Sequence, residues 1–393
     1  MKPRTISDNI SWLGFIDRDR RLFDSLIPLP DGTSYNAYLV KGSEKTALID
    51  SVDPAHADTL MEQLEGIGKI DFIVSQHAEQ DHSGAIPKVL EKYPDAIVFT
   101  TPKGKDLLID HLHLPEDKIR TVQNNENLSL GDKTLQFIYT PWVHWPETMC
   151  TYVPENRILF TCDFFGSHIA STDLFVRDKS KVAEAAKRYY AEIMMPFRSA
   201  IKKNIAAIEQ LDIDLIAPSH GSLYDEPRFI IDEYKTWIAD TPGNLVVIPY
   251  ISMHGSTRVM VEHLVASLAE HGVTAQQFDL AVTDLGKLAI SLVDAATIII
   301  GTPTVHVAPH PAIFYASFLA NALRPKAKFA SVIGSYGWST KAVEKIAEQI
   351  SNLRVEILTP IVCKGFPGNN ILDALDEMAQ RIAEKHKELG ILQ

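Results

Sequence analysis

Apolar residues follow two alternating patterns along most of this sequence. Short runs rich in β-branched residues, typical of buried strands, are separated by longer segments in which apolar residues recur every three or four positions, as on an amphipathic helix. In the first half the pattern predicts strands at 35–40, 46–50, 69–74 and 96–100, further strands around Leu128 and Leu135, and helices at 55–64, 84–93 and 103–113. The stretch 179–211 is predicted to be mostly helical, with a break at Pro196.

Turn-forming residues at 239–244 (Ala-Asp-Thr-Pro-Gly-Asn) interrupt this pattern and mark the predicted domain boundary. We therefore expect two domains, 1–243 and 244–393. Beyond the boundary the pattern predicts strands at 245–250, 273–278, 298–300, 329–333 and 355–358 and helices at 257–271, 310–323, 339–351 and 371–389. Five strands alternating with helices predict an α/β domain built on a doubly wound parallel sheet.

Four potential metal ligands lie on one predicted strand-to-helix turn, directly after the strand at 69–74. They are His77, Glu79, Asp81 and His82. Open α/β sheets place their functional sites at the carboxyl ends of strands, which is where this turn lies. A solvated polar loop can also contain such residues, but three distant segments would not be expected to complete its ligand pattern.

Three further potential ligands each follow, or end, another predicted strand: His144 after 134–139, Asp163 after 157–162, and His220 at the end of 215–220. A single histidine after a strand is more often structural, but four strand ends that each supply a ligand type predict a metal centre. The set holds four imidazoles, three carboxylates and no thiolate. These ligands are hard enough for iron, and carboxylates can bridge two metals.

The second half contains three loops at predicted strand ends that suit a flavin. The first precedes a helix and offers hydroxyls and a glycine, without lysine or arginine, in Ser252, Met253, His254, Gly255, Ser256 and Thr257. It is neither a Walker loop nor a G-x-G-x-x-G turn, so a monophosphate such as that of FMN fits better than ATP or NAD. The other two loops, expected to meet the isoalloxazine ring, comprise Thr302, Pro303, Thr304, Val305 and His306, and Ser335, Tyr336, Gly337 and Trp338.

The order His77-x-Glu79-x-Asp81-His82, then His144, Asp163 and His220, resembles that of flavodiiron proteins, also called A-type flavoproteins, and the three loops resemble theirs as well. The resemblance implies an N-terminal metallo-β-lactamase-like αβ/βα sandwich and a C-terminal flavodoxin-like domain with FMN. It further implies two non-haem irons, one held by His77, Glu79 and His144, the other by Asp81, His82 and His220, with Asp163 bridging. In some family members the histidine equivalent to His82 turns away from the metal, so ligation by His82 stays open.

The commoner hydrolases of this fold carry a histidine at the position of Glu79 and favour zinc, so Glu79 favours a di-iron centre over a di-zinc one. Two alternatives remain: a zinc-dependent hydrolase with an accessory flavodoxin domain, and a flavin electron carrier without catalysis. Family loops often have an aromatic residue where His254 stands and an asparagine near Val305 and His306. Four aromatic side chains are expected either to wall the metal site or to pack in the core: Trp142, Trp145, Phe164 and Phe165.

Charge, cysteine content and hydrophobicity limit the partners and the cellular location that we expect. A formal charge of −12 and a pI near 5.6 disfavour nucleic acid as a partner. The three cysteines include no C-x-x-C pair, which argues against a disulfide scaffold and excludes an iron–sulfur or rubredoxin module within these residues. No apolar run approaches the roughly 18 residues of a membrane span, and the N-terminus lacks the apolar core of a signal peptide. We therefore expect no membrane association and a cytoplasmic location.

The resemblance implies an oxidoreductase that reduces dioxygen to water, nitric oxide to nitrous oxide, or both. FMN and a di-iron centre each hold two electrons, and their sum is what dioxygen needs to become two waters. The electrons would come from an external donor such as rubredoxin, a reduced deazaflavin or a separate reductase. Family members place the flavin of one subunit against the irons of the next, which implies a head-to-tail homodimer or a tetramer.

Overall fold

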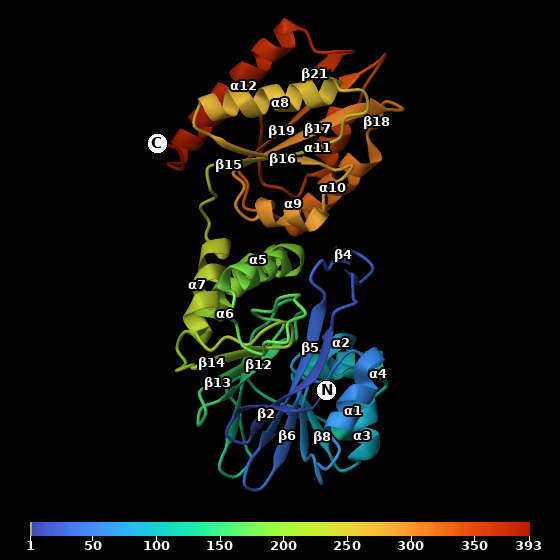
Figure 1. The fold of residues 1–393 in the computed structure, drawn as a ribbon, viewed down its shortest axis with the longest axis vertical. Coiled ribbons are helices and arrows are strands. Elements are labelled where there is room, and N and C mark those ends of the chain that lie inside the picture. Colours follow the sequence, from blue (N-terminus) through green and yellow to red (C-terminus); the bar gives the residue numbers. More distant parts are fainter. Residues whose placement is uncertain (1) are drawn as a thin grey trace. The chain divides into compact units, whose positions relative to one another are not determined.

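The computed structural model describes residues 2–393 and shows two compact units (Figure 1). The first unit runs to Ile238, apart from the short segment Ala191–Pro196, which groups with the second. The second unit otherwise runs from Ala239 to Gln393. The main division therefore falls within a few residues of the turn-rich stretch 239–244.

The first unit is built on two sheets. The larger has the strand order β1 (Arg4–Ser7), β2 (Ile10–Asp17), β5 (Thr33–Lys41), β6 (Thr46–Ile49), β7 (Phe72–Val74), β8 (Ile97–Thr100), β9 (Ile119–Thr121). The other has the order β10 (Asn127–Ser129), β11 (Thr134–Tyr139), β12 (Met149–Val153), β13 (Ile158–Cys162), β14 (Leu215–Pro218). In the larger sheet, neighbouring strands are antiparallel from β1 to β6 and parallel from β6 to β9. In the other sheet they are antiparallel from β10 to β13, and β13 and β14 are parallel. A small hairpin, β3 (Leu22–Phe23) and β4 (Ile27–Pro28), stands apart from both sheets.

Helices cover the outer sides of these sheets. On the side of the larger sheet lie α1 (Ala57–Gln63), α2 (Gln80–Ser83), α3 (Ile86–Lys92) and α4 (Pro102–Leu112), and on the side of the other sheet lie α5 (Lys179–Tyr189), α6 (Arg198–Ile208) and α7 (Pro227–Ile238) (Figure 1). One continuous core of side chains from both sheets, including Trp12, Tyr38, Phe137 and Phe160, fills the space between them. Burial of this core against two helical layers gives the predicted αβ/βα sandwich.

The second unit has a seven-stranded sheet whose main path is parallel, in the order β16 (Thr274–Asp279), β15 (Leu245–Tyr250), β17 (Thr297–Val305), β19 (Phe329–Tyr336), β20 (Glu356–Ile357). Off this path, β21 (Ile361–Lys364) also pairs in parallel with β19, and a short strand pairs antiparallel with the end of β17. Helices α8 (Ser256–Glu270) and α12 (Asn369–Glu388) cover one face, and α9 (Leu285–Leu292), α10 (Pro311–Leu323) and α11 (Ala342–Gln349) the other (Figure 1). From β15, the sheet extends to β16 on one side and through β17 and β19 to β20 on the other. This change in the direction of strand addition at β15 is characteristic of the flavodoxin-like doubly wound fold.

Most predicted elements are present, and the break at Pro196 is confirmed: the helical stretch is interrupted by a π turn at Tyr190–Met194 and a 3-10 turn at Met195–Phe197. Elements that were not predicted include the strands β1, β2, β9 and β12, the hairpin β3–β4, and the helices α7 and α9. Gly14 in β2 has φ 129°, and a Cβ there would lie 2.0 Å from the carbonyl oxygen of Tyr35, so close strand packing requires the glycine. A glycine inside an apolar run weakens the strand signal in the sequence.

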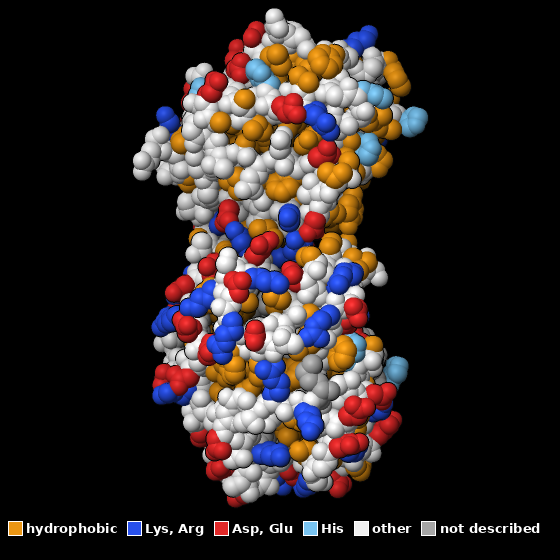
Figure 2. Space-filling view, viewed as in Figure 1, with side chains coloured by type: hydrophobic (Ala, Val, Ile, Leu, Met, Phe, Trp, Pro, Cys, Tyr) orange, Lys and Arg blue, Asp and Glu red, His pale blue; other side chains and the backbone are white. Residues whose placement is uncertain are grey.

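The positively and negatively charged side chains are interspersed on the face of the first unit visible in Figure 2, without a large region of one sign.

Between residues 2 and 393, no helix combines the length and the hydrophobicity that crossing a membrane requires.

Candidate metal centre and flavin site

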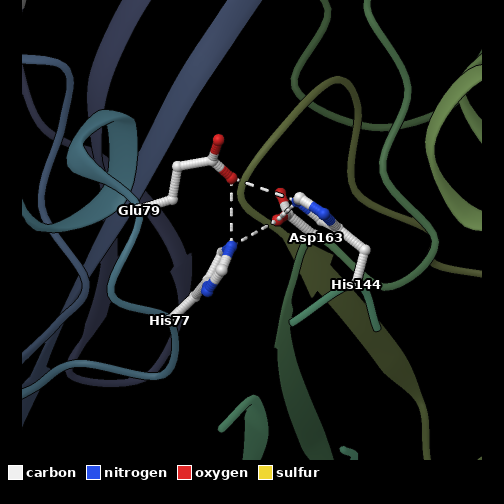
Figure 3. A group of neighbouring side chains, drawn as sticks. All are labelled: His77, Glu79, His144 and Asp163. Carbon is white, nitrogen blue, oxygen red and sulfur yellow. Dashed lines mark hydrogen bonds and ion pairs between the residues drawn. The ribbon is translucent and has the colours of Figure 1, made fainter. Parts of the chain in front are cut away.

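The structure brings all seven predicted ligands together in two groups. In the first, ligand atoms of His77, Glu79, His144 and Asp163 all lie within 4.8 Å of one another (Figure 3). Glu79 Oε2 is 3.1 Å from Nε2 of both His77 and His144. Asp163 Oδ2 is 3.4 Å from His77 Nε2 and 3.5 Å from His144 Nε2. The side chains of His77, Glu79 and His144 thus surround one candidate metal position, and Asp163 Oδ2 faces the same position.

The second group consists of Asp81, His82 and His220. Its three side chains meet through His220 Nε2, which is 3.1 Å from Asp81 Oδ2, and His82 Nε2, which is 3.2 Å from Asp81 Oδ1. The other oxygen of Asp163, Oδ1, lies 2.9 Å from His82 Nε2 and 3.5 Å from His220 Nε2. Asp163 therefore turns one carboxylate oxygen to each group, which is the arrangement a bridging ligand needs.

Local folding fixes the turn that carries four of these residues. After β7, the Ser75 hydroxyl donates to the carbonyl of His77 at 3.0 Å, and the Ser83 hydroxyl donates to the carbonyls of Ala78 and Glu79 at 2.8 and 2.9 Å. The short helix α2 then begins after Glu79 and places Asp81 and His82 on its first turn. The hydroxyl bonds hold the chain in an ordered turn, so its side chains leave in fixed directions.

Two hydrogen bonds orient imidazoles of the metal site. His77 Nδ1 donates to Glu147 Oε1 at 2.6 Å, and the backbone N–H of Ala78 donates to the same oxygen at 3.1 Å. His220 Nδ1 donates to the carbonyl of Ser34 at 2.7 Å. Because a carboxylate or carbonyl accepts the Nδ1 proton, each ring presents its Nε2 lone pair to the centre, as ligating histidines usually do. Sequence reasoning missed Glu147 and Ser34.

The backbone after His220 depends on a glycine. Gly221 has φ 81°, and a Cβ at this position would lie 2.6 Å from the carbonyl oxygen of Ser167. The left-handed conformation and the close approach together require glycine here. The turn brings His220 back towards β5, where the carbonyl of Ser34 accepts its Nδ1 proton.

The electrostatics of the cluster favour bound cations. Burial alone would raise the pKa of Asp163, but His82, His144 and His77 hold it well below its usual range. Burial opposes protonation of His77, yet its pKa is raised because the carboxylates of Glu147, Glu79 and Asp163 place negative charge around the ring. Carboxylates that remain ionised in a buried site demand compensating positive charge, which metal ions supply.

Unpartnered atoms give a direct test of whether this site fits metal ions. The residues described leave both oxygens of Asp81, both oxygens of Asp163 and both ring nitrogens of His82 buried without a directed hydrogen bond, although ion-pair contacts surround them. A buried polar group without a partner costs roughly 1–3 kcal/mol. Metal ions coordinated by these atoms would remove that cost, so the residues present fit a pair of hard metals such as iron.

The three predicted flavin loops lie at the carboxyl ends of β15, β17 and β19, which are neighbours in the sheet. At the first loop, Gly255 has φ 88° and precedes the first turn of α8. Thr257 is 1% exposed, and its Oγ1 has no hydrogen-bond partner among the described residues. A helix N-terminus with an unpartnered buried hydroxyl fits the phosphate of FMN. Ser252 Oγ accepts the backbone N–H of Arg258 at 3.2 Å, which leaves its O–H as a donor.

The other two loops differ from the prediction because the strands are longer. Strand β17 continues to Val305, turns through His306 and Val307 at φ 48° and 66°, and pairs with β18 (Ala308–Pro309). Thr302 Oγ1 accepts the backbone N–H of His310 at 3.1 Å, and the hydroxyl of Thr304 donates to that of Thr340 at 2.9 Å. Strand β19 likewise includes Ser335 and Tyr336. Large apolar side chains stay accessible at Met253, 51% exposed, and Trp338, 78% exposed.

The four aromatic side chains expected either to wall the metal site or to pack in the core take three different positions. The Trp145 ring lies 4.9 Å from the His77 ring and so lines the site. Phe164 and Phe165 are fully buried, stack on each other at 4.0 Å and pack against Tyr234, so they belong to the core. Trp142 is 46% exposed and stacks on Phe197.

Replacing Glu147 by glutamine tests the support that this carboxylate gives to His77. The amide removes the negative charge that accepts the Nδ1 proton, so we expect affinity for one metal to fall about 10–100-fold, as for other outer partners of metal-bound histidine. Chelator competition followed by metal analysis measures this fall. The exposed Glu65→Gln variant is the control, and equal metal retention by both variants would show that Glu147 does not support the ligand.

Comparison with known proteins gives matches over both units. The family model of the "ODP family beta lactamase" matches residues 33–221, and the flavodoxin model matches residues 248–378. The nitric oxide reductase of Moorella thermoacetica is 33% identical, the match covering 98% of this chain and 99% of that protein. The coenzyme F420H(2) oxidase of Methanothermobacter marburgensis is 31% identical over 97% of this chain and 98% of that protein.

A solved structure shows the same two-part architecture. The rubredoxin oxygen:oxidoreductase of Desulfovibrio gigas superposes with a TM-score of 0.94 at 30% identity, covering 98% of this chain and 99% of that one. Together with the seven clustered ligands and the flavodoxin-like sheet, these matches show that the chain belongs to the flavodiiron family of oxidoreductases, the A-type flavoproteins.

Proposed function

We propose that this protein reduces dioxygen to water, nitric oxide to nitrous oxide, or both, at a non-haem di-iron site that receives electrons from FMN. The observation that carries the proposal is the position of Asp163, whose two oxygens face two separate groups of ligands. A single-metal site would not need a carboxylate in this position. The expected domains follow: 1–243 for the irons and 244–393 for FMN.

The first iron would be held by His77, Glu79 and His144, and the second by Asp81, His82 and His220, with Asp163 bridging. The close approach of His82 Nε2 to Asp163 Oδ1 favours a ligating His82 over one turned away. When bound, the irons and FMN supply the electrons and the binding positions that reduction of either gas requires.

The chain itself controls access to the site. The side chains of Glu79 and His144 are 15% and 17% exposed, whereas those of the other five ligands are at most 6% exposed. A small gas molecule would therefore approach on the side of Glu79 and His144. The buried remainder, with Trp145 against His77, excludes bulk water and keeps the ligands in fixed positions.

The electron donor is inferred from the cysteines of the described residues. Its three free cysteines are buried and scattered, so electrons would come from an external donor: rubredoxin, a reduced deazaflavin or a separate reductase. We further propose a head-to-tail homodimer or a tetramer and a cytoplasmic location. Sedimentation measures the oligomeric state directly.

Turnover of both gases by protein of known iron and FMN content tests the function. With a chemically reduced donor, the protein should consume dioxygen or nitric oxide far faster than free FMN at the same concentration, and release water or nitrous oxide. Two irons per chain are expected. Zinc in place of iron with hydrolytic activity would indicate the hydrolase, and reoxidation at the rate of free flavin would indicate an electron carrier.

A further inference from the structure

The segment 218–221, which carries His220 at the end of β14, is held by a strand of the other sheet. Successive side chains of a strand alternate between its two faces, so Ser34, Asn36 and Tyr38 of β5 share one face. All three are buried, and each forms a hydrogen bond with this segment. A candidate ligand of the second group is therefore fixed by a strand that supplies no ligand itself.

Asn36 uses both hydrogens of its side-chain amide on the two ends of this segment. Its Nδ2 donates to the carbonyl oxygens of Pro218 and Gly221, each at 2.9 Å. Its Oδ1 accepts the indole N–H of Trp12 at 2.9 Å. Because an indole N–H can only donate, Oδ1 must face Trp12 and the NH2 group must face the two carbonyls. The surroundings of Asn36 thus determine the orientation of its amide.

Further hydrogen bonds hold the chain on both sides of His220. The backbone N–H of Asn36 donates to the carbonyl of Ser219 at 2.8 Å. The backbone N–H of Gly221 donates to Ser34 Oγ, also at 2.8 Å. The residue before His220 and the residue after it are therefore both tied to β5.

The position of this segment determines where the imidazole of His220 points. The carbonyl of Ser34 accepts its Nδ1 proton at 2.7 Å. Its Nε2 then lies 3.1 Å from Asp81 Oδ2 and 3.5 Å from Asp163 Oδ1. A displacement of about 1 Å is enough to spoil the geometry of a site of this kind. The hydrogen bonds from β5 therefore act on the second group through His220.

We propose that Asn36 is a positioning residue for the second metal position, acting through the segment 218–221 on His220. The first group is supported differently, by the hydrogen bond from His77 to Glu147. The proposal rests on the proposed function, since it requires that the second group holds a metal ion. It predicts an effect at one of the two metal positions, whereas a general loss of packing would affect both.

The test variant is Asn36→Asp, which keeps the size of the side chain and the acceptor for Trp12 but replaces two N–H donors by at most one O–H. The matched control is Asn204→Asp. Asn204 is also buried, and its Nδ2 donates to a carbonyl outside the second group, that of Pro141, at 3.1 Å. Both variants and wild type are prepared free of metal and titrated anaerobically with ferrous iron in competition with a chelator.

In Asn36→Asp we expect the affinity of the second position for iron to fall about 10–100-fold, the range for outer partners of a metal-bound histidine, with the affinity of the first position unchanged. Asn204→Asp should bind iron at the second position as wild type does. Anomalous diffraction from crystals of Asn36→Asp with one equivalent of iron identifies the position that is retained, which should be that of the first group.

Wild-type affinity at both positions of Asn36→Asp, an equal loss at both, or retention of iron at the second position would overturn the positioning role. If Asn36→Asp does not fold, Ser34→Ala decides by the same criterion, because it removes only the acceptor of the Gly221 N–H. Wild-type protein that binds fewer than two irons would instead overturn the proposed function.

Discussion

The Glu79→His variant is expected to be isolated with zinc in place of iron and to lose more than about 100-fold in gas turnover, beyond the upper end of losses seen for outer-shell metal partners. Glu79 Oε2 is 3.1 Å from Nε2 of both His77 and His144, so its carboxylate is one of three ligands in the first group. Replacing that oxygen by an imidazole nitrogen gives a three-histidine position. Nitrogen ligands favour zinc over ferrous iron more strongly than oxygen ligands do.

The measurement is metal content by mass spectrometry, with protein produced at equal supplied iron and zinc, followed by turnover of both gases. The exposed Glu91→His variant, on α3, adds a histidine away from the site and controls for incidental zinc binding. Iron in Glu79→His at the wild-type ratio, with activity retained, would mean that this carboxylate does not select the metal.

Replacing Asp163 by asparagine is expected to remove at least one iron per chain and to reduce turnover by more than about 100-fold, again beyond the losses seen for outer-shell partners. The two oxygens of Asp163 lie 3.4 Å from His77 Nε2 and 2.9 Å from His82 Nε2, in different groups. An amide offers one neutral oxygen in place of two charged ones, so only one group keeps an oxygen from this residue. The variant should therefore bind its two metals with clearly different affinities.

Stepwise loading of metal-free protein with ferrous iron distinguishes these outcomes. Wild type should bind two irons, whereas Asp163→Asn should bind one or none at the same free concentration. The exposed Asp117→Asn variant, on a 3-10 turn, is the control for loss of a carboxylate. Two tightly bound irons in Asp163→Asn would contradict a bridging role.

The fold could be predicted from the sequence because its strands and helices carry regular apolar patterns. Strand β15 was predicted with its observed bounds, Leu245–Tyr250, since it is an unbroken apolar run between turn residues. Strand β2 was missed because Gly14 interrupts its pattern for a packing reason that lies on β5. Helix α9, Leu285–Leu292, is short and contains Gly286, so its helical signal is weak.

The candidate metal site could be predicted for a similar reason. Ligands at strand ends converge because parallel strands such as β13 and β14 deliver their carboxyl ends to one edge, which places Asp163 beside His220. Contacts that depend on three dimensions could not be read in this way. Glu147 and Ser34 hold ligands that are 70 and 186 positions away, and no local pattern records such a pair. The boundaries of the second and third loops were predicted less well, because β17 and β19 extend through them.

The central claim is that seven side chains hold two irons. Anomalous diffraction at the iron absorption edge, on crystals of the protein as purified, tests it most directly. The account predicts two iron peaks about 3.5–4 Å apart, the usual separation in two-metal sites, one among His77, Glu79 and His144 and the other among Asp81, His82 and His220, with Asp163 between them. A single peak, or peaks that appear only at the zinc edge, would contradict it.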